Sequence, residues 1–286
     1  MIVHHDDMAP SKESAYLTEL FKSIVQNNPT DGNVFKQRVT YDSVMTASTE
    51  PTDVMYEDIV LPGPQRGPAK LVKPLNASKA HAIVFFHGGG YTMGSVESHR
   101  KMCGHLAKAC NTLALMVDYR LSPEHPFPAA IDDCVAGYKW LIDQGFQGKS
   151  LITAGDSCGG GLATSVALKV IRDGLPAPGA VVALSPWYDA VGQDSESQRT
   201  NLENDVLQAE DTVDFLAGRY CTGDTDRRDP LISAIFASDE ELSKLPPHWI
   251  SCGGYDQLLD DGIRMAQRLQ RAGVEAILKV GEEMQQ

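Results

Sequence analysis

The chain carries little positive charge, and this shortage argues against one large class of partners. Its 286 residues include 25 Lys and Arg against 38 Asp and Glu, a formal net charge of −13 at pH 7. Such a surface would repel a polyanionic phosphate backbone, and no basic stripe in the sequence offsets it. We therefore expect no nucleic-acid partner.

Long hydrophobic runs are also absent. No apolar stretch approaches the roughly 18–20 residues that a membrane-spanning helix needs. The N-terminal segment has neither the basic start nor the apolar core of a signal peptide. The hydrophobic content of 42% is ordinary for a globular protein with one sizeable core. We expect a cytoplasmic protein without a membrane span.

Clustered cysteines are the third absence. The six cysteines are scattered without Cys-x-x-Cys spacing, at positions 103, 110, 134, 158, 221 and 252. A zinc site or a disulfide framework needs tighter grouping, so we expect reduced thiols, as in cytosolic proteins. No metal ion and no organic cofactor is implied.

Short apolar runs alternate with segments of helical periodicity along most of the chain. Two strand-like stretches at residues 54–61 and 69–73 come first. The apolar runs that follow them cover residues 82–86, 113–117, 151–154, 180–184, 249–252 and 276–280. Helical spacing of apolar residues is clearest at residues 14–27, 103–109, 129–144, 161–172 and 262–272. Buried strands that alternate with helices predict an α/β fold, with a mostly parallel sheet covered by helices on both faces.

One polar, acidic and partly helical segment, residues 191–228, breaks this alternation. We interpret it as an excursion over the sheet. Ligands in this fold class bind beyond the carboxyl ends of the strands, and insertions there usually shape the site. The residues directly after each strand are therefore the candidates for chemistry.

Two glycine-rich turns follow predicted strands. One reads GDSCGG around Ser157 and leads into a predicted helix, which is the G-x-S-x-G arrangement that exposes a nucleophilic serine. The other reads HGGG, directly after the run 82–86, and no Lys follows at the spacing of a phosphate-binding loop. A serine that attacks a carbonyl needs donors for the oxyanion. We expect the backbone N–H groups of Gly88, Gly89 and Cys158 to supply them.

A carboxylate after a late strand is the expected third member of a serine triad, because folds with this serine turn carry Ser, Asp and His in that chain order. Asp256 follows the run 249–252 and is the candidate acid. Asp260 and Asp261 compete with it. They lie just before a predicted helix, however, and are better interpreted as helix caps.

Together these residues resemble the hormone-sensitive-lipase-like family of α/β-hydrolases, a group of serine carboxylesterases. The resemblance covers most of the chain from about residue 80 onward. Further segments contribute to it, namely DYRLSPEHPFPAA from Asp118, SPWYD from Ser185, DPLIS from Asp229 and YDQLLD from Tyr255. It implies one α/β-hydrolase domain, residues 1–286, with an eight-stranded and mostly parallel sheet. Its core would span about 53–190 and 229–286, beneath a helical cap from about 1–50 and 191–228.

The sequence departs from this family at the base. The family's catalytic histidine follows the last strand, in a turn resembling GMPHGF. Aligning the last residues of the chain with that turn places Met284 on the methionine and Gln286 on the histidine. The chain has eight histidines, and none lies after His248. Either Gln286 replaces the histidine, by engineering or by descent, or the register slips and the histidine lay beyond the end of this sequence.

The resemblance implies hydrolysis of a small carboxylic ester or lactone, with Ser157 attacking and Asp256 orienting the base. A glutamine cannot take up the serine proton at neutral pH. With Gln286 at the base position, we expect this chain to bind esters and turn them over very slowly. A catalytically silent receptor that uses the same pocket for a small molecule is the alternative, and amide hydrolysis needs the same parts.

Trp187 and Tyr188 follow a strand end and either line the pocket or pack in the core. A homodimer is left open.

Overall fold

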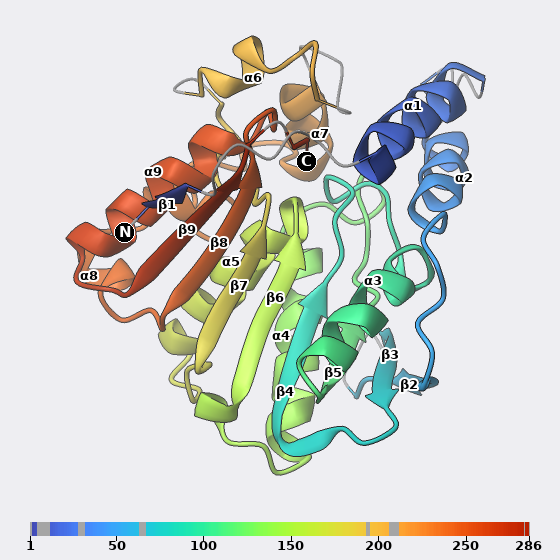
Figure 1. Ribbon diagram of the computed structural model, residues 1–286. Helices are drawn as coiled ribbons and strands as arrows, with labels where there is room; N and C mark the ends of the chain where they lie inside the picture. Colours follow the sequence, from blue (N-terminus) through green and yellow to red (C-terminus); the bar gives the residue numbers. More distant parts are fainter. Residues whose placement is uncertain are drawn as a thin grey trace.

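The computed structural model describes residues 2–4, 12–27, 32–62, 67–192, 195–205, 212–282 and 284–285. Within these residues nine strands form one sheet, in the order β1-β9-β8-β7-β6-β4-β5-β3-β2 (Figure 1). The strands are β1 (Ile2–His4), β2 (Val54–Val60), β3 (Pro68–Pro74), β4 (Ser78–Phe86), β5 (Thr112–Val117), β6 (Leu151–Asp156), β7 (Ala180–Leu184), β8 (His248–Gly253) and β9 (Ala276–Gly281). In this spatial order, all neighbouring strands from β1 through β9 and onward to β5 pair in parallel. The strand β3 pairs antiparallel with β5 and with β2. The predicted α/β class with a mostly parallel sheet is confirmed.

The sheet has one strand more than the eight that were predicted. The short strand β1 pairs in parallel with β9 at the edge of the sheet. Its 3 residues lie in a polar leader and give no alternating pattern, so the sequence does not distinguish this strand from a loop. These residues belong to the sheet and not to the N-terminal cap region in which they were predicted.

The described residues form nine α-helices and two short 3₁₀ helices, Gly148–Ser150 and Ala234–Phe236. The α-helices are α1 (Lys12–Asn27), α2 (Val34–Met45), α3 (Val96–Ala109), α4 (Ala129–Asp143), α5 (Cys158–Arg172), α6 (Ser197–Thr200), α7 (Thr212–Tyr220), α8 (Asp239–Leu242) and α9 (Leu259–Arg271). Every helix predicted from periodicity is present, and most begin earlier than predicted. α3 begins at its capping box, in which the N–H of Ser98 donates to Ser95 Oγ at 3.1 Å. Its first turn is largely polar, so it adds little to an apolar stripe.

Helix α2 was not predicted, because residues 30–50 show no clear apolar stripe. Phe35 and Val39 are 65% and 68% exposed on it. The helix starts at a good cap, since the side chain of Asn33 accepts the N–H groups of Phe35 and Lys36. A helix held by its cap and its neighbours leaves a weak periodic signal in the sequence.

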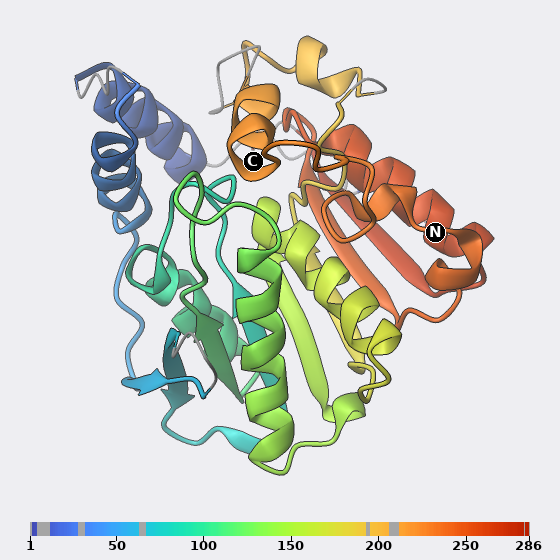
Figure 2. The same ribbon diagram turned by 180° about the vertical axis from the view of Figure 1, so that it is seen from behind.

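Alternate residues of the central strands face two different core clusters. Along β4, Val84 and Phe86 pack in a large cluster with α4, α5 and α9, whereas Ile83 and Phe85 pack in a smaller one with α3. This alternation is the two-residue period of a strand. Figures 1 and 2 show α3 on one side of the sheet and α4 and α5 on the other. Because both faces are covered, the central strands are apolar throughout, which explains the continuous runs in the sequence.

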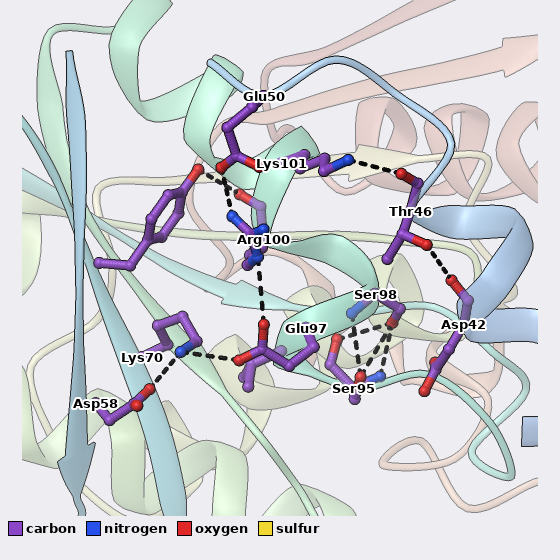
Figure 3. Close-up of polar contacts among 12 residues, drawn as sticks. Asp42, Thr46, Glu50, Asp58, Lys70, Ser95, Glu97, Ser98, Arg100 and Lys101 are labelled. Carbon is purple, nitrogen blue, oxygen red and sulfur yellow. Dashed lines mark hydrogen bonds and ion pairs between the residues drawn. The ribbon is translucent and has the colours of Figure 1, made fainter. Parts of the chain in front are cut away.

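The segment between α2 and β2 is held against α3 by side chains of that helix. Lys101 Nζ donates to the carbonyl oxygen of Thr46 at 2.7 Å (Figure 3) and to that of Ser48 at 2.8 Å. Arg100 forms an ion pair with Glu50 (Figure 3). These contacts anchor the C-terminal end of α2 to a helix that itself packs on the sheet.

Four helices lie beyond the carboxyl ends of the central strands. In Figures 1 and 2, α1 and α2 stand on one side of that edge and α6 and α7 on the other. The two groups are joined where Arg219 of α7 donates to Oε1 of Gln37 on α2 at 2.7 Å. None of the helices in the described ranges is long and apolar enough to cross a membrane.

Candidate active site

Four loops leave the sheet on the same side, at the carboxyl ends of their strands, because these strands run parallel. The register pairs Phe86 of β4 with Gly155 of β6, and Gly253 of β8 with Gly281 of β9. β7 lies between β6 and β8. The residues predicted to form the site follow β4, β6, β8 and β9, so the fold gathers them at this edge from distant parts of the chain.

Ser157 lies in a sharp turn between β6 and α5. Its backbone has φ 54° and ψ −124°, a conformation that residues other than glycine rarely adopt. Its N–H donates to the carbonyl of Leu184 at 2.8 Å, and its carbonyl accepts the N–H of Trp187 at 2.9 Å. The side chain is partly exposed, and its hydroxyl has no hydrogen bond to a described residue. This is the strand, strained turn and helix that a nucleophilic serine requires.

Close packing of the serine turn requires a glycine at position 159. A Cβ there would overlap the carbonyl oxygen of Phe86, the last residue of β4. The start of α5 therefore touches the neighbouring strand through bare backbone. This contact explains the glycine that follows two positions after Ser157.

The N–H of Gly88, predicted as an oxyanion donor, is occupied within the protein. It donates to Oδ1 of Asp156, the residue before Ser157, at 3.1 Å. A Cβ on Gly88 would overlap Oδ2 of the same carboxylate, so a larger residue would have to displace it. In this geometry Gly88 fixes the HGGG loop to the serine turn and offers no free donor to a substrate.

Asp156 has a second partner that was not predicted. Its Oδ2 lies 3.3 Å from Nε2 of His99, a fully buried residue of α3. Nδ1 of His99 lies in turn 2.8 Å from Oγ of Ser98. Asp156 is visible in the sequence as the acidic residue inside the serine motif. Its pairing with His99, 57 positions away, leaves no sequence signal.

Two of the predicted oxyanion donors remain available. The N–H groups of Gly89 and Cys158 have no acceptor among the described residues. Cys158 is the first residue of α5, where the backbone N–H lacks an intrahelical partner and the helix dipole favours negative charge. The arrangement therefore suits an anion that forms beside Ser157.

The side chain of Cys158 serves the loop and not the chemistry. Its Sγ is buried and accepts the N–H of Tyr91 at 3.2 Å. Burial raises the pKa of this thiol to about 12. It is therefore protonated at neutral pH and is no nucleophile. The thiol fills the space behind the HGGG loop and helps to fix its position.

Asp256 lies fully buried in the loop after β8. Its Oδ1 accepts the N–H of Leu258 at 2.7 Å, whereas its buried Oδ2 has no hydrogen-bond partner in the described part of the chain. Burial is the main cause that raises the pKa of this carboxyl to about 7, and the charge of Asp205 raises it further. In a serine triad, the base histidine donates its N–H to such an oxygen.

Asp260 and Asp261 are not helix caps, contrary to the prediction. They lie in the first turn of α9, and the N-cap residue Leu258 makes no side-chain hydrogen bond. Oδ2 of Asp261 accepts two backbone N–H groups of the loop after β7, each at 2.8 Å. Asp260 accepts the N–H of Ser197 at 2.8 Å. Contacts with other loops have replaced local capping at both residues.

The last described residues fold back against the loop that carries Asp256. The N–H of Tyr255 donates to the carbonyl of Met284 at 2.9 Å, and the N–H of Gly254 donates to that of Gly281 at 2.7 Å. Gln286, predicted to occupy the position of the base, lies outside the described residues.

No histidine whose side chain the structure describes contacts the hydroxyl of Ser157. His87 is buried and stacks on Tyr119 with ring centroids 4.1 Å apart, and burial lowers its pKa to about 3. Burial also lowers the pKa of His248 to about 4. His99 is engaged by the carboxylate before the serine. None of these side chains is placed to replace the base.

The two aromatic residues after β7 pack in the core. Trp187 is 4% exposed and Tyr188 is fully buried, with its hydroxyl 3.0 Å from Oγ1 of Thr164. Core packing is therefore the correct one of the two alternatives.

All six cysteines are free thiols, and within the described ranges no group of three or more His, Cys, Asp or Glu could hold a metal ion.

A cavity of about 420 Å³ opens beside α2, lined by Arg38 and by the loops around Ser95 and Glu124. Neither Ser157 nor the candidate acid lines it. This cavity is therefore not the candidate active site.

Comparison with known proteins gives a consistent result. The alpha/beta hydrolase fold family matches residues 83–285. The chain is 35% identical over 271 residues to an acetyl-hydrolase of Streptomyces hygroscopicus, which covers 93% of this chain and 87% of that protein. It is 34% identical over 222 residues to an ethyl acetate hydrolase of Pseudomonas putida, which covers 74% of this chain and 68% of that protein. A solved esterase from the bacterial hormone-sensitive lipase family matches with a TM-score of 0.89 at 33% identity, covering 97% of this chain and 90% of that one.

The family match extends from within β4 to beyond β9 and so includes both Ser157 and Asp256. The solved esterase shares nearly the whole fold with this chain. The chain therefore belongs to the hormone-sensitive-lipase-like family of α/β-hydrolases, as its motifs predict.

Proposed function

We propose that this site acts on small carboxylic esters or lactones through Ser157, and that the chain turns them over very slowly because Gln286 occupies the position of the base. One observation carries the proposal. The strained serine turn and Asp256, whose Oδ2 is buried without a partner among the described residues, lie at the same edge of the sheet. The acetyl-hydrolase and the ethyl acetate hydrolase among the relatives support a small ester as the substrate.

In the proposed reaction, Oγ of Ser157 attacks the carbonyl carbon and the carbonyl oxygen becomes an oxyanion. The N–H groups of Gly89 and Cys158 hold this oxygen at the positive end of α5. Removal of one such donor typically lowers the rate by about 10²–10³. Gly88 contributes indirectly, because its contact with Asp156 keeps the loop in place.

The weak step is removal of the serine proton. In a complete triad a histidine takes this proton, and the acid holds the histidine in the correct orientation. The amide of Gln286 can form hydrogen bonds but has no site for the proton at neutral pH. Enzymes that lack one triad member retain about 10³–10⁴-fold catalysis over water, from the oxyanion hole and from binding. We expect activity of this order.

We further propose that α1, α2, α6 and α7 form a cap over one α/β-hydrolase domain. These helices lie beyond the carboxyl ends of the strands (Figure 1), where insertions usually shape the site. The cap would set the size of the acyl and alcohol groups that the site accepts.

The same observations favour a second function, a receptor that binds a small molecule and does not hydrolyse it. The nucleophile turn at Ser157 and the acid Asp256 are present, but no histidine side chain in the described part of the chain contacts Ser157. A receptor would bind its ligand beside Ser157 without hydrolysing it.

Hydrolysis of p-nitrophenyl acetate by the protein, with γ-butyrolactone as a competitor, tests the proposal. We expect saturable but slow release of p-nitrophenol, at about 10³–10⁴ times the uncatalysed rate, and inhibition by the lactone. Saturable binding of both compounds with no release above the uncatalysed rate would favour the receptor. A folded protein that neither binds nor hydrolyses them would contradict both functions.

A further inference from the structure

The segment 195–205 lies across the loop that carries the candidate acid. It belongs to the excursion between β7 and β8. Oγ of Ser197 donates to the carbonyl of Gln257 at 2.7 Å, and the N–H of Asp260 donates to the same Oγ at 3.1 Å. The start of α6 is thereby attached to the residues that follow Asp256.

Asn201 binds the backbone of the acid itself. Its Nδ2 donates to the carbonyl of Asp256 at 2.9 Å and to that of Gly254 at 3.1 Å. One amide group therefore holds two carbonyl oxygens that lie on either side of Tyr255. A side-chain amide supplies the two N–H donors that such a bridge needs.

Asp205 holds the next residue of the same turn. Its Oδ2 accepts the N–H of Gln257 at 2.8 Å. Asp205 and Asp256 are both fully buried, and Gln257 is 2% exposed. Hydrogen bonds in such a water-free setting fix a backbone more firmly than the same bonds at the surface.

We propose that Asn201 and Asp205 are positioning residues for Asp256, so that the segment 195–205 holds the acid-bearing turn in its working shape. The inference rests on the proposed function in one respect, namely that Asp256 is the acid of the site. Asn201 fixes the carbonyl of the acid, and Asp205 fixes the N–H that follows it. The excursion between β7 and β8 thus contributes to the catalytic geometry as well as covering the site.

Asp205 also acts on Asp256 through its charge. Besides burial, the groups that affect the pKa of Asp256 are Asp205 in the excursion, the hydroxyl of Ser185 after β7, and the backbone of Leu258 and Gly253. Burial raises the pKa of the Cys252 thiol on β8, and the carboxylate of Asp256 in turn raises it further. Ser185 lowers the pKa of Asp256, whereas Asp205 raises it. A neutral acceptor in place of Asp205 would keep the hydrogen bond and remove the repulsion.

The variant Asp205→Asn separates these two effects. Carbon-13 NMR of aspartate-labelled protein follows the titration of the Asp256 carboxyl, and Asp256→Asn identifies its resonance. We expect the titration midpoint of Asp256 to move downward in Asp205→Asn. It should stay in place in Asp224→Asn, which changes an exposed aspartate of the same excursion. An unchanged midpoint in a folded Asp205→Asn protein would overturn the role of Asp205.

The variant Asn201→Ala tests the hold on the backbone. We expect hydrogen exchange of the Leu258 N–H, which donates to Asp256, to become about tenfold faster or more, while amides in the middle of α5 stay unchanged. Asn204→Ala, which changes an exposed asparagine nearby, is the matched control. Equal exchange at Leu258 in both variants would overturn the role of Asn201. If Asn201→Ala does not fold, Asn201→Asp, which keeps the size of the side chain, serves instead.

Neither measurement requires turnover, so a failure of ester hydrolysis leaves both intact. Where the Gln286→His protein does hydrolyse an ester, Asn201→Ala and Asp205→Ala, each of which removes a hydrogen bond to the acid-bearing turn, should lower kcat with little change in KM. That pattern distinguishes a displaced acid from a damaged substrate pocket, which would change KM. An effect confined to KM would contradict the positioning role.

Discussion

The carboxylate of Asp156 accepts the N–H of Gly88 at 3.1 Å and so joins the residue before the nucleophile to the first glycine of the HGGG loop. The two glycine-rich motifs of the sequence are therefore in direct contact. His99 supports the same carboxylate from α3. The nucleophile turn and the oxyanion loop form one unit, and a change at any of these residues should affect both.

Substitution of Gly88 by alanine tests this contact. The added Cβ would overlap Oδ2 of Asp156, so the carboxylate has to move and its contact with the loop is disturbed. We expect Gly88→Ala to lower the free energy of unfolding by about 1–3 kcal/mol, the usual cost of overpacking. Chemical denaturation measures it. Gly67→Ala is the matched control, because a Cβ on Gly67 would meet no atom of the described residues within 4 Å. Equal stabilities of the two variants would argue against the contact.

The backbone strain at Ser157 makes a second prediction. Its φ of 54° favours glycine over any residue with a Cβ. Ser157→Gly and Ser157→Ala both lack the nucleophile, yet we expect the glycine variant to be more stable by about 1 kcal/mol. Thermal and urea denaturation of the two variants measure the difference. A less stable glycine variant would show that the turn carries no strain.

The buried carboxyl of Asp256 should make the protein less stable as the pH rises. Burial, and then Asp205, raise its pKa from 3.8 to about 7. Because the folded pKa exceeds the unfolded one, the folded state binds this proton more tightly. The resulting stabilisation is fully present below about pH 4 and is lost as the pH rises through about 7. The contribution is on the order of a few kcal/mol.

The variant Asp256→Asn removes this group. Between pH 5 and 7 its free energy of unfolding should fall less, or rise more, than that of the parent. Urea denaturation at several pH values measures both curves, and Asp224→Asn serves as the control for the loss of one exposed carboxyl. Parallel curves for the parent and Asp256→Asn would show that the pKa of Asp256 is not raised.

Arg38 should control how firmly α2 is attached. Its Nε donates to the carbonyl of Thr92 at 2.8 Å, and Nη2 donates to that of Ser122 at 3.0 Å. Both Nη atoms also bind Glu124, at 2.8 and 2.7 Å. A lysine keeps the charge but cannot reproduce this planar fork. We expect hydrogen exchange in α2 to become several-fold faster in Arg38→Lys. Arg271→Lys, which changes an exposed arginine on α9, is the control. Equal exchange rates of the α2 amides in the two variants would contradict this prediction.

The fold was predictable from the sequence wherever burial on both faces makes a strand apolar throughout. Phe85 and Phe86 face opposite core clusters, and each needs an apolar partner. β1 and α2 were missed because neither has such a pattern. β1 has 3 residues, and α2 exposes the apolar side chains of Phe35 and Val39.

The candidate site was predictable only in its local parts. The strand, the turn at Ser157 and the helix follow one another directly, so one short motif contains them. The contacts of Asp156 with His99 and of Asn201 with Asp256 join residues 57 and 55 positions apart, and packing alone brings them together. Asp261 was misread for the same reason, because its partners lie on the loop after β7.

The central proposal is that Ser157 is a nucleophile and that Gln286 stands at the position of its base. A double-mutant cycle tests it, with kcat/KM for p-nitrophenyl acetate measured for the parent, Gln286→His, Ser157→Ala and the double variant. Residues that act as one unit are strongly non-additive. We predict that Gln286→His raises kcat/KM by about 10³ or more. Ser157→Ala should then abolish that gain, and it should lower the small kcat/KM of the parent by a much smaller factor. No gain in a folded Gln286→His protein, or an equal loss from Ser157→Ala in both backgrounds, would contradict the account.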